Sequence, residues 1–168
     1  MMFDAELTAG ASRLLEQCRA GNLRLSTVES CTGGLVAGLL TSIAGSSDVF
    51  EAGFVTYSND AKSRLIGVSA ELIRIHGAVS EETARAMAEL ALSAVPQADI
   101  GLSVTGIAGP GGGTPAKPVG LVHVAAARRG RPTIHSELRL GDPGRENIRL
   151  RSVRAVMELG SRQALAVP

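Results

Sequence analysis

Ser30 and Cys31 place a hydroxyl and a thiol side by side at a turn between two predicted elements. Residues 23–28 are typical of a short strand and residues 35–43 of a helix. The Gly33-Gly34 pair opens that helix, whose first backbone N–H groups lack helical partners and can bind an anion or a developing oxyanion. The turn therefore indicates acyl or amide chemistry. The alternative is a cluster of N-capping side chains in an ordinary strand–helix turn.

A glycine-rich segment from Thr105 to Pro115 is the second feature with chemical potential. It follows a short apolar strand predicted at residues 100–104, at the kind of place where open α/β sheets bind ligands. Such a backbone can present several N–H groups to a phosphate or an oxyanion. No Gly-Lys-Ser/Thr follows, so it is not a P-loop, and no G-x-G-x-x-G opens a helix here. A flexible surface loop is the alternative.

Lys62 is one of only two lysines, with Lys117, among 17 basic residues. Lysine can lose its proton when it is desolvated, whereas arginine cannot, so Lys62 is a candidate general base. It lies about one turn into a helix predicted at residues 60–66. Tyr57, the single tyrosine, ends the preceding strand, predicted at residues 48–57. The alternative for Lys62 is a solvated charge on a short polar helix.

Arg145 is the last candidate. It falls in the first turn of a helix predicted to open at Asp142-Pro143, with aspartate as N-cap and proline at the first helical position. The helix dipole opposes a cation there, and a bound anion would remove this conflict. The guanidinium fork suits phosphate in particular. Arg149, Arg151 and Arg154 are expected on a solvated face of the same helix.

Composition and charge exclude several classes of protein. Hydrophobic residues make up 45% of the 168, which indicates a globular chain. The net charge is +1 and the aromatic residues are one Tyr and three Phe, which argues against a nucleic-acid partner. No apolar run reaches the ~18 residues that a membrane span needs, and the N-terminus lacks a signal-peptide pattern. We therefore expect a cytoplasmic protein without a membrane partner.

The cysteines and histidines do not form a recognisable metal site. Cys18 and Cys31 are too few for a disulfide framework, and Cys18 falls on the apolar stripe of the first helix. His76, His123 and His135 are widely separated and lack the spacing of metal ligands. His123 and His135 could meet across a hairpin, but a surface or core role is expected. The sequence thus predicts neither a metal nor a cofactor.

The order of the expected elements predicts an α/β fold. An amphipathic helix that ends near Gly21 precedes the first strand, and three helices, the longest capped by Ser80, separate the second strand from the third. Strands at residues 119–127 and 133–140 are expected to form an antiparallel hairpin before the last helix. This order implies one mixed, mostly parallel sheet with helices on both faces. Residues 1–168 are expected to form one domain.

Several ordered segments together resemble the carboxy-terminal domain family of CinA proteins. They are Glu29–Gly34, Gly45–Ser47, Gly53–Asn59 with Lys62, His76–Ser80, Val104–Gly112 and Lys117–Gly120. The similarity extends over residues 7–165 and is to the stand-alone form, which lacks the amino-terminal domain of the larger CinA proteins. The resemblance implies a three-layer α/β/α sandwich with a mixed sheet.

The resemblance also implies an activity. Members of the CinA carboxy-terminal domain family include nicotinamide mononucleotide deamidases. These enzymes convert nicotinamide mononucleotide and water to nicotinic acid mononucleotide and ammonia and so recycle pyridine nucleotides. The expected binding partner is then nicotinamide mononucleotide. Whether the chain also forms a homo-oligomer is left open. One alternative is a catalytically inactive nucleotide-sensing or partner-binding module linked to competence or DNA damage. A hydrolase that uses the Cys31 thiol is a weaker alternative.

The resemblance and the residues agree on one mechanism. Ser30 would attack the carboxamide carbon, and neutral Lys62 would take its proton. Tyr57 and Thr105 would orient Lys62 or the substrate. Backbone N–H groups near residues 32–34 would hold the oxyanion, and the glycine-rich loop and Arg145 would hold ribose and phosphate. The expected substrate-binding residues are Cys31, Thr32, Gly33, Gly34, Gly106, Ala108, Gly109 and Arg145.

Overall fold

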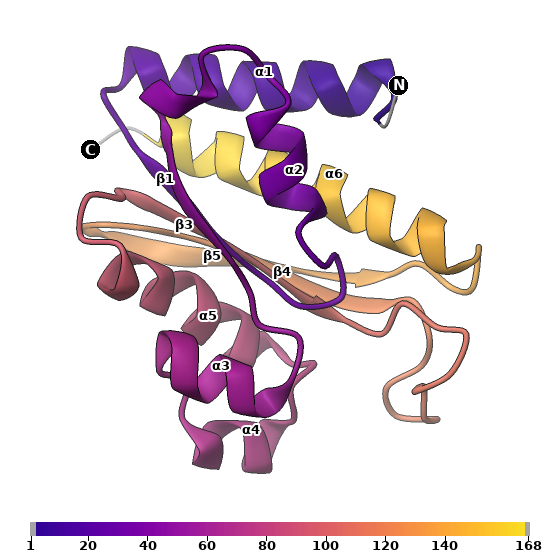
Figure 1. Cartoon of the computed structure of the whole chain (residues 1–168). Coiled ribbons are helices and arrows are strands. Elements are labelled where there is room, and N and C mark those ends of the chain that lie inside the picture. Colours follow the sequence, from indigo (N-terminus) through magenta and orange to yellow (C-terminus); the bar gives the residue numbers. More distant parts are fainter. Residues whose placement is uncertain (1–2, 167–168) are drawn as a thin grey trace.

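The structure is a computed structural model that describes residues 3–166. Five strands form a single mixed sheet between two layers of helices (Figure 1). In chain order the elements are α1 (Ala5–Ala20), β1 (Leu25–Glu29), α2 (Leu35–Thr41), the short 3-10 helix η1 (Ser46–Asp48), β2 (Phe50–Val55), α3 (Asn59–Ile66), α4 (Ala70–His76), α5 (Glu81–Ala94), β3 (Ile100–Gly106), β4 (Leu121–Arg128), β5 (Arg131–Arg139) and α6 (Arg145–Leu165).

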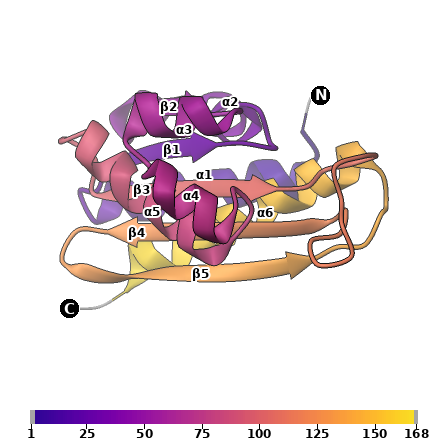
Figure 2. The ribbon, with the colours of Figure 1, turned by 90° about the horizontal axis from the view of Figure 1, so that it is seen from below.

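The strand order across the sheet is β2-β1-β3-β4-β5 (Figure 2). Strands β2, β1 and β3 run parallel, and the β4–β5 hairpin joins β3 in antiparallel pairing. Helices α1, α2 and α6 cover one face, and α3, α4 and α5 cover the other (Figure 1). The prediction of a three-layer α/β/α sandwich with a parallel core and a closing hairpin is therefore confirmed.

Side-chain caps explain where most helices begin. The Asp4 carboxylate accepts the Leu7 N–H at 2.7 Å, and serine hydroxyls cap α3, α4 and α5 in the same way. The predicted cap at the start of α6 is wrong. This helix begins at Arg145, and Asp142 instead accepts the N–H of Gly144, which has a φ of +91°. An aspartate that bonds two residues ahead forms a local turn, and the helix starts only after it.

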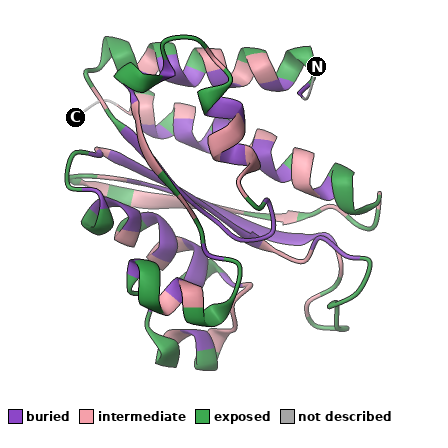
Figure 3. Cartoon of the chain, viewed as in Figure 1, coloured by how far each residue is buried: buried purple, intermediate pink, exposed green. Residues whose placement is uncertain are grey.

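The central strands are buried on both sides. All five residues of β1 are buried, as are six of the seven residues of β3 (Figure 3). Cys18 is fully buried in the core between the sheet and α1, as its place on the apolar stripe predicts. Helix α5 lies directly on β3, because a Cβ on Gly101 would stand 2.2 Å from the Ala88 carbonyl oxygen. The side chains of β1 and β3 are therefore tightly fixed.

The connections that leave the parallel strands lie on opposite faces of the sheet. The chain passes from β1 to β2 through α2 on one face, and from β2 to β3 through α3, α4 and α5 on the other (Figure 1). The carboxyl end of β1 is thus a topological switch point, where open α/β sheets bind ligands. Ser30 directly follows β1 at this point. Within residues 3–166, no helix combines the length and apolarity that crossing a membrane requires.

Candidate active site

Ser30 and Lys62 lie next to each other at the carboxyl end of β1. Lys62 Nζ lies 3.0 Å from Ser30 Oγ, although 32 residues separate them in sequence. Ser30 is held at the end of β1 because its N–H donates to the Val104 carbonyl oxygen of β3 at 2.9 Å. Lys62 projects from α3, and its side chain is among the largest that are fully buried in the molecule. The predicted Ser–Lys contact is therefore present.

The environment of Lys62 favours a neutral amine. Nζ also donates to the Thr56 carbonyl oxygen at 2.8 Å, and among residues 3–166 the amine has no carboxylate partner in an ion pair. Burial lowers the pKa of Lys62, and this effect outweighs the opposing influence of the nearby Cys31 thiol. A desolvated amine without a counter-ion can accept a proton from the hydroxyl next to it.

The N-terminus of α2 is occupied by Glu29. This carboxylate accepts the N–H groups of Gly34, Val36 and Ala37 at 2.9–3.0 Å, and the Gly33 N–H donates to the Ser30 carbonyl oxygen at 3.0 Å. The expectation that Gly33 and Gly34 hold an oxyanion is therefore wrong. The acid that directly precedes Ser30 folds back and takes the free N–H groups that an external anion would need.

A cavity of about 280 Å³ opens beside the Ser–Lys pair. Its lining contains most of the site residues expected from the sequence. They are Ser30, Cys31, Tyr57, Lys62, Thr105, Gly106, Ala108, Gly109 and Arg145. Thr32, Gly33 and Gly34 do not line it. The N–H groups of Ala108 and Gly109 donate to no acceptor within the described residues, so they are available to an oxyanion.

Arg145 joins two parts of the cavity rim. Its guanidinium donates to the Gly109 carbonyl oxygen at 2.7 Å and to the Tyr57 hydroxyl at 3.0 Å. Tyr57 is 60% exposed and contacts Arg145 and not Lys62. The Thr105 hydroxyl donates to the Ala78 carbonyl oxygen at 2.7 Å. Neither Tyr57 nor Thr105 hydrogen-bonds Lys62, which donates to the Thr56 carbonyl oxygen instead. The other part of the expectation, that Tyr57 and Thr105 orient the substrate, stays a prediction.

Comparison with known proteins shows the family of this chain. Residues 7–163 match the family model described as the CinA C-terminal domain. The chain belongs to this family. The structure superimposes on that of the competence/damage inducible protein CihA from Agrobacterium tumefaciens with a TM-score of 0.91 and 50% identity, covering 94% of each chain. It also resembles a CinA superfamily protein from Klebsiella pneumoniae, with a TM-score of 0.88 and 32% identity over 94% of this chain and 97% of that one.

Curated relatives of this CinA domain are longer proteins. A CinA-like protein from Myxococcus xanthus is 44% identical over 168 residues, which is 99% of this chain and 39% of that protein. A CinA-like protein from Citrifermentans bemidjiense is 55% identical over 118 residues, which is 70% of this chain and 28% of that protein. The chain therefore spans well under half of the length of either relative.

Some contacts of the CinA site escaped the sequence-based expectations. Arg149, expected on a solvated face, donates to the carbonyl oxygens of Cys31 at 3.2 Å and Thr32 at 2.8 Å. It therefore holds the turn that carries Ser30 and Cys31. The available signal was its spacing, because a residue four positions after Arg145 faces the same side of a helix. The carbonyl of Thr56 left no signal, since every residue has one.

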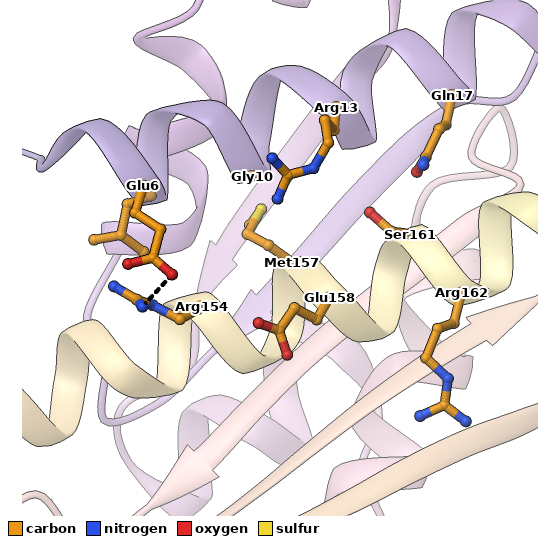
Figure 4. A pocket seen from close by; sticks show the side chains of 10 residues that line it. Glu6, Gly10, Arg13, Gln17, Arg154, Met157, Glu158, Ser161 and Arg162 are labelled. Carbon is orange, nitrogen blue, oxygen red and sulfur yellow. Dashed lines mark ion pairs between the residues drawn. The ribbon is translucent and has the colours of Figure 1, made fainter.

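A second hollow, of about 230 Å³, lies between α1 and α6, the helices that cover the same face of the sheet as α2 (Figure 4). Arg154 of α6 pairs with Glu6 of α1 across it at 2.6 Å, so Arg154 is not simply solvated as expected. No residue proposed for catalysis lines this hollow. The residues proposed for catalysis therefore lie outside this hollow, at the carboxyl ends of the parallel strands.

Cys31→Ala is expected to change the kcat of a reaction at this site by less than about threefold, because the thiol is mostly protonated and therefore a weak nucleophile. Burial raises the pKa of Cys31 to about 11, so the thiolate is scarce at neutral pH. Steady-state turnover of the purified variant measures this. Loss of most activity in Cys31→Ala, in a variant with wild-type circular dichroism, would restore the thiol as a candidate nucleophile.

Proposed function

We propose that this protein is an amidohydrolase that converts nicotinamide mononucleotide and water to nicotinic acid mononucleotide and ammonia through a Ser–Lys acyl-enzyme. The observation that carries the proposal is the buried 3.0 Å contact between Ser30 Oγ and an amine that has no carboxylate partner in the described part of the chain. The relatives' names refer to CinA or to competence and damage, and state no reaction. The reaction is therefore inferred from the site and the resemblance.

In the acylation step, Lys62 Nζ takes the proton of Ser30 Oγ as the oxygen attacks the carboxamide carbon. The negative charge on the former amide oxygen meets the N–H groups of the glycine-rich loop. Lys62 then returns its proton to the amide nitrogen, the C–N bond breaks, and ammonia leaves. The remaining nicotinoyl group is an ester on Ser30.

The deacylation step uses the same groups in the same order. Lys62 takes a proton from water, whose oxygen attacks the ester carbon. Collapse of the second tetrahedral intermediate breaks the bond to Ser30 Oγ, and Lys62 returns the proton to that oxygen. The acid product leaves as its carboxylate. No step requires a metal or a cofactor.

Ammonia release from nicotinamide mononucleotide by the purified protein tests the proposal. Nicotinamide and nicotinamide riboside serve as comparison substrates, and Ser30→Ala gives the background. Release that follows enzyme concentration, with one equivalent of nicotinic acid mononucleotide formed, is the expected result. Tight binding of the nucleotide without turnover would favour the alternative, a nucleotide-sensing module. Pyridine nucleotide recycling is an intracellular task, so the proposal includes a cytoplasmic location.

Arg145→Ala is expected to raise KM for the mononucleotide about 10- to 100-fold, the value of one or two charge-assisted hydrogen bonds to phosphate. The guanidinium spends two donors on Gly109 and Tyr57 and keeps others for a ligand. The slow reaction of the riboside, which lacks the phosphate, should barely change. Equal losses on both substrates would show that Arg145 acts only by holding the glycine-rich loop.

A further inference from the structure

The segment between α4 and α5 forms one wall of the cavity through Ala78 and Val79. We call residues 76–79 the wall segment. Each of its four consecutive carbonyl oxygens accepts a hydrogen bond from a side chain. The pairs are His76 with Lys117 at 2.6 Å, Gly77 with Ser80 at 3.0 Å and Thr83 at 2.7 Å, Ala78 with Thr105 at 2.7 Å, and Val79 with Lys117 at 2.8 Å.

Lys117 holds both ends of the wall segment. Its ammonium donates to the carbonyl oxygens of His76 and Val79, and among residues 3–166 it pairs with no carboxylate. The two acceptors use two of its three N–H donors. The position of the Lys117 amine also requires a glycine at residue 77. A Cβ on Gly77, whose φ is +82°, would stand 2.6 Å from Lys117 Nζ, so only glycine leaves room for the amine.

Lys117 comes from a second stretch of chain that also lines the cavity. Residues 107–120 connect β3 to β4, and Ile107, Ala108, Gly109, Gly111 and Gly112 of this connection line the cavity. One ammonium thus ties the wall segment to the glycine-rich connection. The residues that both segments supply to the cavity lining are small or apolar, and such a lining suits a flat aromatic ring. We call the part of the cavity that these two segments line the slot.

We propose that Lys117 is a positioning residue that sets the width of this slot and thereby selects a flat aromatic carboxamide. The proposal rests on the proposed function and deepens it, because it assigns the ring-binding part of the site. Lys117 does not line the cavity, and its hydrogen bonds go to the wall segment. It therefore acts through the wall segment and takes no part in bond-making.

The kinetic test compares Lys117→Met with a variant that moves the lysine by one position. Lys117→Met leaves two carbonyls without their charged donor, and we expect KM to rise at least ~10-fold with kcat within about threefold. The pH dependence of kcat/KM should stay unchanged, since the surroundings of Lys62 are intact. The double variant Ala116→Lys/Lys117→Met keeps the net charge at an exposed neighbouring position and should not restore KM.

A double-mutant cycle tests whether the amine acts through the wall segment. Gly77→Ala should raise KM by a similar factor, because its Cβ would displace the amine. The Gly77→Ala/Lys117→Met double variant should be little worse than the more severe single variant. Fully multiplicative effects would overturn the proposal, as would a restored KM in the variant with the transposed lysine.

A measurement of backbone order keeps this proposal separate from the proposed function. In the free protein, ¹⁵N order parameters of Ala78 and Val79 should lie near about 0.85 and fall towards about 0.6 in Lys117→Met. Unchanged order in that variant would overturn the tie. Absence of turnover in the wild type would defeat the proposed function but leave this readout intact. A shifted pH profile in Lys117→Met would show that Lys117 acts on the Ser–Lys pair, which also overturns the proposal.

Discussion

Ser30→Ala is expected to lower kcat for release of ammonia at least ~10³-fold, which corresponds to about 4 kcal/mol of transition-state stabilisation. The reason is that, among residues 3–166, no other hydroxyl is hydrogen-bonded to Lys62. Ser30 Oγ is 3.0 Å from the buried amine, whereas the Thr105 hydroxyl is bonded to the Ala78 carbonyl oxygen. Without the nucleophile, no acyl-enzyme can form. The measurement is single-turnover product formation with enzyme in excess over the nucleotide.

The variant should remain folded and should still bind substrate. The serine side chain contributes one hydrogen bond, and Lys62 keeps its bond to the Thr56 carbonyl oxygen. Calorimetric titration of Ser30→Ala with the mononucleotide should therefore give an affinity close to the wild-type KM. Cys31→Ala is the matched control at the adjacent position. Activity above about a tenth of the wild-type value in Ser30→Ala would eliminate the acyl-enzyme route.

The elements were predictable because local signals agreed with the final packing. Serine at positions 58, 69 and 80 caps three helices, and the apolar stripe of α1 packs on the core. The start of α6 was not predictable, because the Asp142-Pro143 pair is compatible both with a helix N-cap and with a turn before the helix. Gly141 and Gly144 both adopt positive φ, and these backbone angles delay the helix to Arg145. Residue type alone does not reveal that choice.

The site was predictable where it depends on topology. Residues that follow β1, β2 and β3 had to meet at one edge, because those strands are parallel neighbours. The errors concern contacts that join one element of the fold to another. Glu29 takes the N-terminus of α2, and Arg149 reaches back over 117 and 118 residues to the turn. Spacing places Arg149 on the same side of α6 as Arg145, but the partners of Arg149 and of Glu29 do not follow from spacing within one segment.

The pH dependence of the reaction should follow the protonation of Lys62. The neutral amine is the active form, so kcat/KM should rise with pH as Lys62 loses its proton. Burial lowers the pKa of Lys62, so this rise should occur below the pH range in which an exposed lysine titrates. A profile of kcat/KM against pH, recorded with the mononucleotide, measures it.

Lys62→Met and Lys62→Arg are both expected to lower kcat about 10²- to 10⁴-fold, the usual contribution of a general base. Methionine has no basic nitrogen, and arginine stays protonated at every pH at which the protein is folded. Lys62 is only 1% exposed, so the larger and permanently charged guanidinium must also be accommodated in a closed space. Lys62→Met should therefore fold better than Lys62→Arg, and the rise with pH should vanish from its residual activity.

Arg64→Met is the matched control, because Arg64 lies on the same helix and forms only an exposed ion pair with Asp60. It should retain wild-type turnover, since such a pair contributes about 0.3–0.5 kcal/mol to stability and nothing to the cavity. Substantial activity in Lys62→Arg would mean that a permanent cation suffices at this position. The role of Lys62 would then be to stabilise charge, and the base would have to be sought among the other groups that line the cavity.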